Sequence, residues 1–597
     1  MKLKSALLLF LLLLCHPLLA SSLFAPDSVP QHTNLLPIHV PTEKYNHFAL
    51  SGNPFIYDRM LSPFQFDSTI CPLAGDFRFG MNPYQQYLDY DPSLIPLDTN
   101  LGVSLIRIVL GSKREQLLFL DHHQRISKHL SGSVAYNSIV SPGFLLNCFS
   151  FYRRFNIGLN YESALLHSTL NFKYGRIEAD ENGGIKDGQS IEGISKSTFE
   201  QLQTFLPDDK RKARRYQADF KNAVLLWSTQ NADSVKKFNF LLNADFAWYK
   251  WGTAYTGTTD SAFYQNNFLD SLVTNDTSGY SYYKAQPSLS VLFSGEHSSI
   301  LLNAGVGLFY LKQRIDSLKQ SLDYSSTFLN LLFKTRAFSW SVDARRVISN
   351  NYNDGDYSLF SEMFVGPAGN VLSGISVSVG NSEVSPEATS EYYSSNHFRW
   401  NNDFQKEKFS WLHANFSFAN NAIQVYGQLT NVEHLVYFNN LSLPLQSESS
   451  SQIIMAGVKL DYCLKKWRVV GDARWMYSSK EIIRVPEFGG YLRFSFRDRF
   501  FKNALFAEFG TSFYGLSEWK SYAFMPATGI SYLQSSEITG GAPTLDLFVN
   551  ADIGRATLTI MLQRVNDGLF GGENYIAPGY PAPPRTLKFG VLWKLFN

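Results

Sequence analysis

The densest cluster of charged side chains in the sequence is a basic run with the chemistry to bind phosphate. Its members are Lys210, Arg211, Lys212, Arg214 and Arg215. Arginine and lysine side chains bind phosphate oxygens through charge-assisted hydrogen bonds. One hypothesis is a contact with the phosphates of lipopolysaccharide at the outer rim of a membrane protein. The alternative, which we favour, is a solvated loop whose charge is partly offset by Asp208 and Asp209.

Other patterns with catalytic or metal-binding chemistry are incomplete or missing from the sequence. His122-His123 would supply only part of a metal site, and no further ligand stands at a suitable spacing. The sequence has neither a G-x-S-x-G nucleophile turn nor an H-E-x-x-H zinc helix. We therefore expect no enzyme, no cofactor and no metal centre.

The composition narrows the class of protein. The chain has 597 residues, of which 15% are aromatic and 17% are charged, and its formal net charge is +2. An apolar share of 45% is too high for a disordered chain. The near-zero net charge argues against a nucleic-acid-binding protein.

Residues 1–22 are typical of a secretory signal peptide. Lys2 and Lys4 precede an apolar run from Ala6 to Cys15, and small residues follow at Ala20-Ser21-Ser22. This order predicts export and cleavage after Ala20 or Ser22. The apolar run is too short for a membrane-spanning helix.

Beyond Leu101, long stretches alternate between apolar and polar residues. Clear examples are 454–462, 467–476, 545–553 and 556–563. Successive side chains of a β-strand point to opposite faces, so each stretch predicts a strand with one apolar and one polar face. Gly554-Arg555, between the last two stretches, fits a two-residue hairpin turn.

Three features favour a closed membrane barrel over a soluble β-sandwich, which would show the same alternation. Aromatic residues such as Trp467 and Trp475 stand at strand ends, as in the interfacial girdles of membrane barrels. The alternation recurs over most of the chain, and a sheet of that size needs closure to remove its edges. The chain also ends on such a strand, in which Phe589, Trp593 and Phe596 are similar to the C-terminal assembly signal of bacterial outer-membrane barrels. We expect the barrel assembly machinery to recognise it.

We therefore predict an all-β protein, a transmembrane antiparallel β-barrel, with three regions. They are the signal peptide 1–22, a proline-rich segment 23–98 that is either periplasmic or a lumenal plug, and the outer-membrane barrel 99–597. The expected strand number lies between ~18 and ~24, with ~22 as the best estimate. The expected long excursions are 178–216, 252–278 and 567–585. Long loops of such barrels face outward and short turns face the periplasm, but this regularity breaks near 498–500.

The polar faces of the predicted strands define a charged lumen, because lysine or arginine at the lipid midplane costs ~2–4 kcal/mol. The predicted lumen-facing residues are Lys459, Asp461, Arg468, Asp472, Arg474, Arg493, Arg497, Glu508, Asp546, Asp552, Lys588 and Lys594. Such a lining would tune ion selectivity. The alternative is that these residues pair with one another, or with a plug, and conduct nothing.

Several short stretches occur in an order shared with a known family. They are Asn82-Pro83-Tyr84, Asn182-Gly183-Gly184-Ile185, 396–402, 483–487, 521–526, 544–550, Tyr580-Pro581 and Phe589-Gly590 with Trp593. On these residues the sequence resembles the porins of the Bacteroidota outer membrane. The resemblance implies an outer-membrane barrel of a Gram-negative bacterium and a porin function, and it brings no catalytic residues.

The expected function is passive diffusion of small hydrophilic solutes through an outer-membrane channel. The partners would be outer-membrane lipid, lipopolysaccharide, the barrel assembly machinery and the solutes, with no nucleic acid. One alternative is a plugged, energised transporter similar to TonB-dependent ones. The other is a non-conducting barrel that scaffolds a secretion or surface complex.

Overall fold

The sheet of this protein closes on itself. The computed structural model describes residues 72–80, 84, 102–186, 201–230, 237–259, 263–315, 318–367, 372–568 and 575–596. Within these residues, 22 antiparallel strands form one sheet, and its first strand β1 (Val103–Gly111) pairs with its last strand β30 (Thr586–Phe596). The predicted antiparallel barrel and its best strand number are confirmed. The expected signal peptide and most of the segment 23–98 lie outside the described residues.

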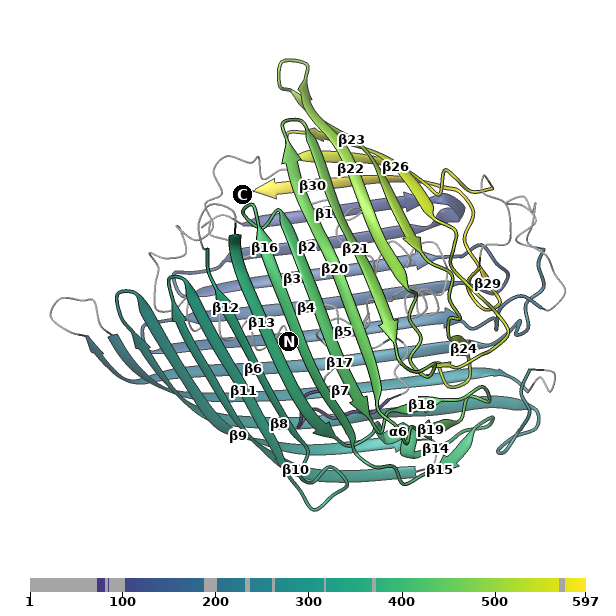
Figure 1. The fold of residues 1–597 in the computed structure, drawn as a ribbon, viewed down its shortest axis with the longest axis horizontal. Helices are drawn as coiled ribbons and strands as arrows, with labels where there is room; N and C mark the ends of the chain where they lie inside the picture. The colour runs from purple at the N-terminus through teal and green to yellow at the C-terminus, as the bar shows by residue number, and fades with distance from the viewer. Residues whose placement is uncertain are drawn as a thin grey trace.

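Each barrel strand pairs with the next one along the chain, as Figure 1 shows. The first half of the wall continues with β2 (Gln116–Arg125), β3 (Leu130–Ser141), β4 (Ser150–Glu162), β5 (Leu166–Asp180), β6 (Lys210–Gln230), β7 (Lys237–Thr258), β8 (Val273–Ser294), β9 (Ser298–Ile315), β10 (Leu318–Thr335) and β11 (Phe338–Ile348). The second half comprises β12 (Tyr357–Val365), β13 (Leu372–Val384), β16 (Glu407–Phe418), β17 (Ile423–Glu433), β20 (Ser451–Leu464), β21 (Trp467–Ser478), β22 (Phe488–Phe500), β23 (Leu505–Leu516), β26 (Thr544–Ile553) and β27 (Ala556–Gln563).

Short elements gather at one end of the barrel (Figure 1). They form the hairpins β14 (Tyr392–Ser394) with β15 (Arg399–Asn401), β18 (Val436–Phe438) with β19 (Pro444–Gln446), β24 (Ala523–Met525) with β25 (Ile530–Tyr532), and β28 (Tyr575–Ala577) with β29 (Tyr580–Pro581). In the described part of the chain, the helical pieces are α6 (Ala388–Glu391) and the 3₁₀ turn η3 (Ser112–Arg114). Among the described residues, no helix has the length and hydropathy to cross a membrane.

The two ends of the barrel differ in their connections. One end, which we call the loop end, carries long connections such as 385–406 and 517–543, and the other, the turn end, carries tight ones such as 465–466 and 554–555. Gly554 adopts a left-handed φ of 65°, which lets β26 reverse into β27 within two residues. The sequence suggested that the alternation of long loops and short turns breaks near 498–500. In the structure β22 continues to Phe500 and turns at 501–504, so the alternation holds there as well.

The structure corrects the predicted excursions. Residues 210–216 belong to β6, and 252–258 and 273–278 belong to β7 and β8, so these three strands extend much further than expected. Three long connections, 385–406, 434–450 and 517–543, are absent from the predicted set. The polar outer residues at the loop end of long strands resemble loop sequence, which explains the errors in 178–216 and 252–278.

Candidate functional site: the barrel lumen

The two faces of the wall differ sharply in exposure. In β9, Leu302 and Leu308 are 40% and 52% exposed, whereas the alternate residues Leu301 and Asn303 are buried. The same alternation runs along the other barrel strands. Since large apolar side chains of a membrane barrel face lipid, the exposed apolar face is the exterior and the opposite face lines the lumen.

The structure places every predicted lumen-facing residue on the inner face. The strand pairings place all of them at alternate positions on the same face of the sheet. These residues are Lys459, Asp461, Arg468, Asp472, Arg474, Arg493, Arg497, Glu508, Asp546, Asp552, Lys588 and Lys594. Many of them form ion pairs. Arg468 lies 2.7 Å from Asp461 and Arg493 lies 3.0 Å from Glu508. This part of the lining is therefore both charged and internally paired.

Two of these ion pairs are buried. The Arg474–Asp472 contact is 2.6 Å long, and Asp472 also accepts a 2.7 Å hydrogen bond from the Tyr426 hydroxyl. Lys588 lies 3.1 Å from Glu115, a residue of the β1–β2 connection that the sequence analysis did not single out. Glu115 leaves no sequence signal, because it approaches Lys588 only when β30 closes against β1.

A second polar stretch of the inner wall was missed from the sequence. Asn243 donates to Ser290 (2.7 Å), Ser290 donates to Asn303 (3.1 Å), and Asn330 donates to Asp343. These residues belong to β7–β11 and follow one another around the wall. The inner faces of these strands also carry buried leucines such as Leu241, Leu301 and Leu332, so no simple contrast between an apolar and a polar face marks this stretch in the sequence.

A short piece of the N-terminal segment lies against this inner wall. The backbone N–H of Ala74 donates to the hydroxyl of Ser358 on β12 (3.1 Å), and the Tyr324 hydroxyl on β10 donates to the carbonyl of Gly75 (3.3 Å). Phe79 contacts Trp251 with ring centroids 6.1 Å apart. Residues 72–80 are thus lumenal, and the rest of 23–98, apart from Tyr84, lies outside the described residues.

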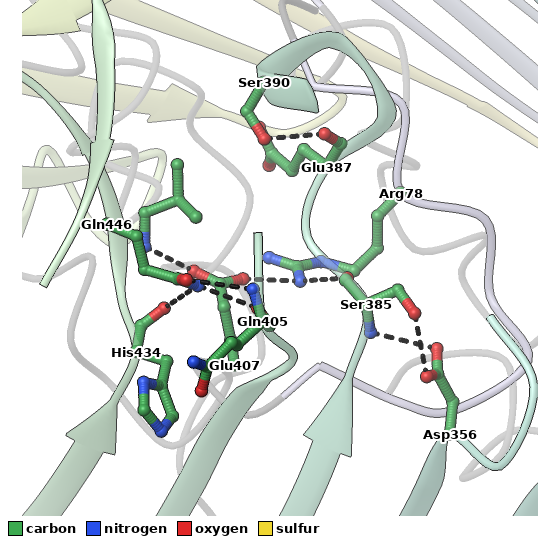
Figure 2. A network of polar contacts seen from close by, with 10 residues as sticks. Arg78, Asp356, Ser385, Glu387, Ser390, Gln405, Glu407, His434 and Gln446 are labelled. Atoms are coloured by element: carbon green, nitrogen blue, oxygen red, sulfur yellow. Dashed lines mark hydrogen bonds and ion pairs between the residues drawn. The ribbon is translucent and has the colours of Figure 1, made fainter. Parts of the chain in front are cut away.

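Arg78 anchors this piece through the polar network in Figure 2. Its guanidinium donates to the Glu407 carboxylate (2.7 Å) and to the carbonyl of Ser385 (2.8 Å). The other Glu407 oxygen accepts the Val436 N–H (2.9 Å). Asp356 accepts two hydrogen bonds from Ser385, and burial raises the pKa of this aspartate while Lys406 opposes the rise. The network joins the N-terminal segment to three connections of the loop end.

The backbone adds two further links to the same place. The N–H groups of Ala388 and Thr389 donate to the carbonyls of Arg78 and Phe79, each at 2.9 Å. The N-terminal piece around Arg78 is therefore docked on α6 inside the barrel. Arg78 lies about three hundred residues before its partners Ser385 and Glu407 in the sequence.

The hairpins of the loop end fold inward and pack with the wall. A large apolar cluster joins Phe79, Trp251 and Tyr280 to Trp400 of β15, Phe524 of β24 and Tyr580 of β29. Ile185 donates its N–H to Gly579 (2.9 Å), and a Cβ on Gly184 would lie 3.0 Å from that carbonyl oxygen. The Asn182–Ile185 motif therefore serves to dock one loop on another.

The 396–402 motif holds the β7–β8 connection. Asn396 accepts the N–H groups of Leu269 and Asp270 at 2.9 Å, and His397 stacks on Tyr264 with centroids 3.8 Å apart. Burial lowers the pKa of His397, which therefore stays neutral and hydrogen-bonds Thr274 and Asn266. Its role in the described structure is packing of the loops.

Strand β6 contains the basic run 210–215, which corrects both the favoured prediction of a solvated loop and the hypothesis of one phosphate clamp in that loop. Arg211 and Arg215 are buried on the inner face, and Arg211 lies 3.3 Å from Glu181. Lys210, Lys212 and Arg214 are exposed on the exterior. Because β6 begins at Lys210, consecutive residues point to opposite faces.

The remaining predicted residues have simple placements. Phe589 and Trp593 are exposed on the exterior of β30, and Phe596 pairs with Val103 where the barrel closes. His122 hydrogen-bonds Ser104 (2.8 Å). In the part of the chain that the structure describes, no group of three or more histidine, cysteine, aspartate or glutamate residues could hold a metal.

A closed barrel with an apolar exterior, a charged lumen and inserted loops defines a large outer-membrane β-barrel of the porin or transporter type. The chain belongs to the family described as "Putative porin", whose model matches residues 74–597. No curated protein matches the sequence.

The fold is similar to several solved structures. The siderophore receptor PiuA from Acinetobacter baumannii has a TM-score of 0.57 at 11% identity, over 83% of this chain and 82% of that chain. The copper transporter OprC has a TM-score of 0.59 at 10% identity, over 83% and 80%. The FrpB iron transporter from Neisseria meningitidis has a TM-score of 0.57 at 9% identity, over 84% and 82%. At these identities the similarity concerns the fold alone.

Proposed function

We propose that this protein is an outer-membrane channel for small hydrophilic solutes, constricted by residues 72–80 and by the inward-folded loops. The observation that carries the proposal is the polar inner wall with Arg78 docked on it. A charged lining stabilises hydrated solutes and disfavours apolar ones. A barrel of ~22 strands has a wide lumen that is usually filled, so constriction by the chain itself is expected.

The proposal extends to export, assembly and surroundings. The chain would be exported through a cleaved signal peptide, and its terminal strand with Phe589, Trp593 and Phe596 would be recognised by the barrel assembly machinery. Lipid and lipopolysaccharide would contact the exterior. The proposal assigns the chain no catalytic chemistry, and no cofactor.

An energised transporter is the second candidate, and the fold supports it. Its 22 strands and inserted N-terminal segment are arranged in a barrel similar to those of a siderophore receptor and of metal transporters. A transporter would bind one solute tightly and require an energy-coupling partner. A scaffold would instead copurify with a stoichiometric protein partner.

Single-channel recording in planar bilayers tests the proposal. The purified full-length chain is compared with a variant that lacks residues 23–98. We expect stable ohmic steps, and larger steps for the deletion variant. A folded, heat-modifiable barrel that inserts but gives no steps in either form would overturn the channel. Saturable uptake that collapses with the proton gradient would then favour the transporter.

A further inference from the structure

The exterior of β4–β9 carries a strip of basic residues near the loop end. We call it the basic strip, and its members are Arg153, Arg176, Arg214, Lys250 and Lys312. In the ladder, Arg153 pairs with Arg176, and Arg176 pairs with Arg214. On the next strands, Lys250 pairs with Ser281, and Ser281 pairs with Lys312. All five occupy the same alternate strand positions as the exposed apolar residues, so their side chains point away from the lumen.

The direct pairing of three arginines is unfavourable by itself. Like charges that stand opposite each other on neighbouring strands destabilise a sheet. Glu178 offsets part of this charge, since its carboxylate lies 3.1 Å from Arg176 Nε and 3.8 Å from Lys212. Arg153 and Arg214 flank that pair, so the strip keeps a net positive charge. An anion with several oxygens would relieve the repulsion by binding between the guanidinium groups.

A belt of aromatic residues lies directly below the strip, toward the turn end. Tyr174, Tyr216, Trp248 and Tyr310 each stand two residues along a strand from a strip residue, about 7 Å away. Tyr174 and Tyr216 have ring centroids 5.2 Å apart, and Tyr216 stacks on Trp248 at 6.4 Å. Tyrosine and tryptophan concentrate where hydrocarbon meets headgroups. The strip therefore lies at the headgroup level.

An apolar groove continues from this belt into the hydrocarbon zone. Its volume is about 500 Å³, and its walls include Leu170, Phe220, Phe246, Tyr283, Leu308 and Tyr310. Asp219 and Lys284, whose side chains belong to the inner face, also border it, and most of its lining is apolar. Ala218 and Ala285 also line it. Small side chains between large ones leave room for an acyl chain against the strands.

We propose that the exterior of β4–β9 binds a phosphorylated, multiply acylated glycolipid of the outer leaflet, the lipid A part of lipopolysaccharide. Its phosphates bind the basic strip, and an acyl chain occupies the groove. Charge complementarity selects this occupant, because the strip needs a multiply charged anion and the groove needs a chain joined to it. The inference rests on the outer-membrane placement and is independent of conduction.

Thermal unfolding in detergent, with and without diphosphorylated lipid A, tests this site. The double variant Arg153→Gln/Arg214→Gln keeps the Arg176–Glu178 pair. We expect it to unfold at the same or a higher temperature than the wild type without lipid, because like charges are removed. With lipid A, the wild type should gain stability and the variant should lose at least tenfold in apparent affinity. Lys408→Gln, an exposed cation outside the strip, is the matched control and should behave as wild type.

Two further probes separate the parts of the site. Dephosphorylated lipid A should bind wild type and double variant equally weakly, and inorganic phosphate alone should not stabilise the barrel. Ala285→Trp fills the groove without a change of charge and should weaken lipid A binding. Equal lipid A affinity in wild type and double variant, or stabilisation by inorganic phosphate as large as by lipid A, would overturn the proposal. A barrel that binds lipid A without conducting would refute only the channel.

Discussion

Removal of the Arg78 side chain should release the N-terminal piece from the barrel wall. Glu407 is only 3% exposed, and its partner Arg78 is 23% exposed. In Arg78→Ala the Glu407 carboxylate keeps the Val436 N–H but loses its cation. Breaking a buried ion pair by removing one partner costs ~3–5 kcal/mol. The partial exposure of Arg78 reduces this cost, so we expect ~3 kcal/mol, or about a hundredfold shift toward the undocked state.

Hydrogen exchange measured by mass spectrometry gives a direct assay. The amides of Ala388 and Thr389 donate to the carbonyls of Arg78 and Phe79, and they exchange when the segment undocks. Arg78→Ala should accelerate exchange in the peptide that contains these amides by about a hundredfold. Peptides of the opposite wall, such as those of β2 and β3, should exchange as in the wild type. In bilayers, the same variant should spend more time at high conductance.

A double-mutant cycle with Glu407→Gln isolates the pair. If the ion pair holds the segment, the double variant should cost little more than Arg78→Ala alone, because the uncompensated carboxylate is gone. The control is Arg585→Ala, which removes an exposed arginine that donates to Val565 and Asp567 of its own connection. Strictly additive effects in the cycle, or unchanged exchange at Ala388 and Thr389, would refute the reasoning.

The other predictions concern the lumen and its pH dependence. Cys463 is exposed on the inner face of β20 and Cys148 is buried, so a hydrophilic thiol reagent should modify Cys463 in the folded protein and leave Cys148 intact; equal labelling of both, detected by mass spectrometry, would contradict this. Lys459→Gln/Arg497→Gln should shift the reversal potential in a salt gradient toward cations, because it removes two positive charges from the lining; an unchanged potential would argue against an aqueous path there. Burial, and then Asp403, raise the pKa of Glu391 from 4.5 to about 7, so the packing of α6 should weaken as pH rises from 4.5 through 7. Glu391→Gln should flatten this pH profile of exchange at Ala388, and a variant that keeps the profile would exclude Glu391 as its source.

The strands could be predicted because alternation is a local property of the chain. The stretches 454–462 and 545–553 lie within β20 and β26, and Gly554-Arg555 forms the turn that follows β26. The period of two depends only on the backbone of successive residues and on the contrast between lipid and water. Counting such stretches limited the strand number to a range of about 18 to 24, and the best estimate within it, 22, is the number observed. The face of each charged residue, such as Lys459 or Asp552, followed from the same alternation.

The boundaries of the long strands could not be read in this way. Beyond the hydrocarbon zone both faces of a strand meet polar surroundings, so the contrast disappears and 210–216 resembles a loop. The basic run shows the consequence, since Arg211 and Arg214 look equivalent in sequence and lie on opposite faces of β6. Only the register of β6 against its neighbours β5 and β7 shows that Arg211 faces the lumen and Arg214 the exterior.

The sequence by itself determined the strand pattern and the two faces of the strands that alternate clearly, but it did not reveal the long connections 385–406, 434–450 and 517–543. Tertiary structure alone decided what fills the lumen. The Arg78–Glu407 ion pair and the Gly184–Gly579 approach join residues that are hundreds of positions apart. The exterior basic strip likewise arises from residues on five strands that become neighbours only when those strands pair. Such contacts depend on the closed geometry of the barrel, and no local pattern of residue types records them.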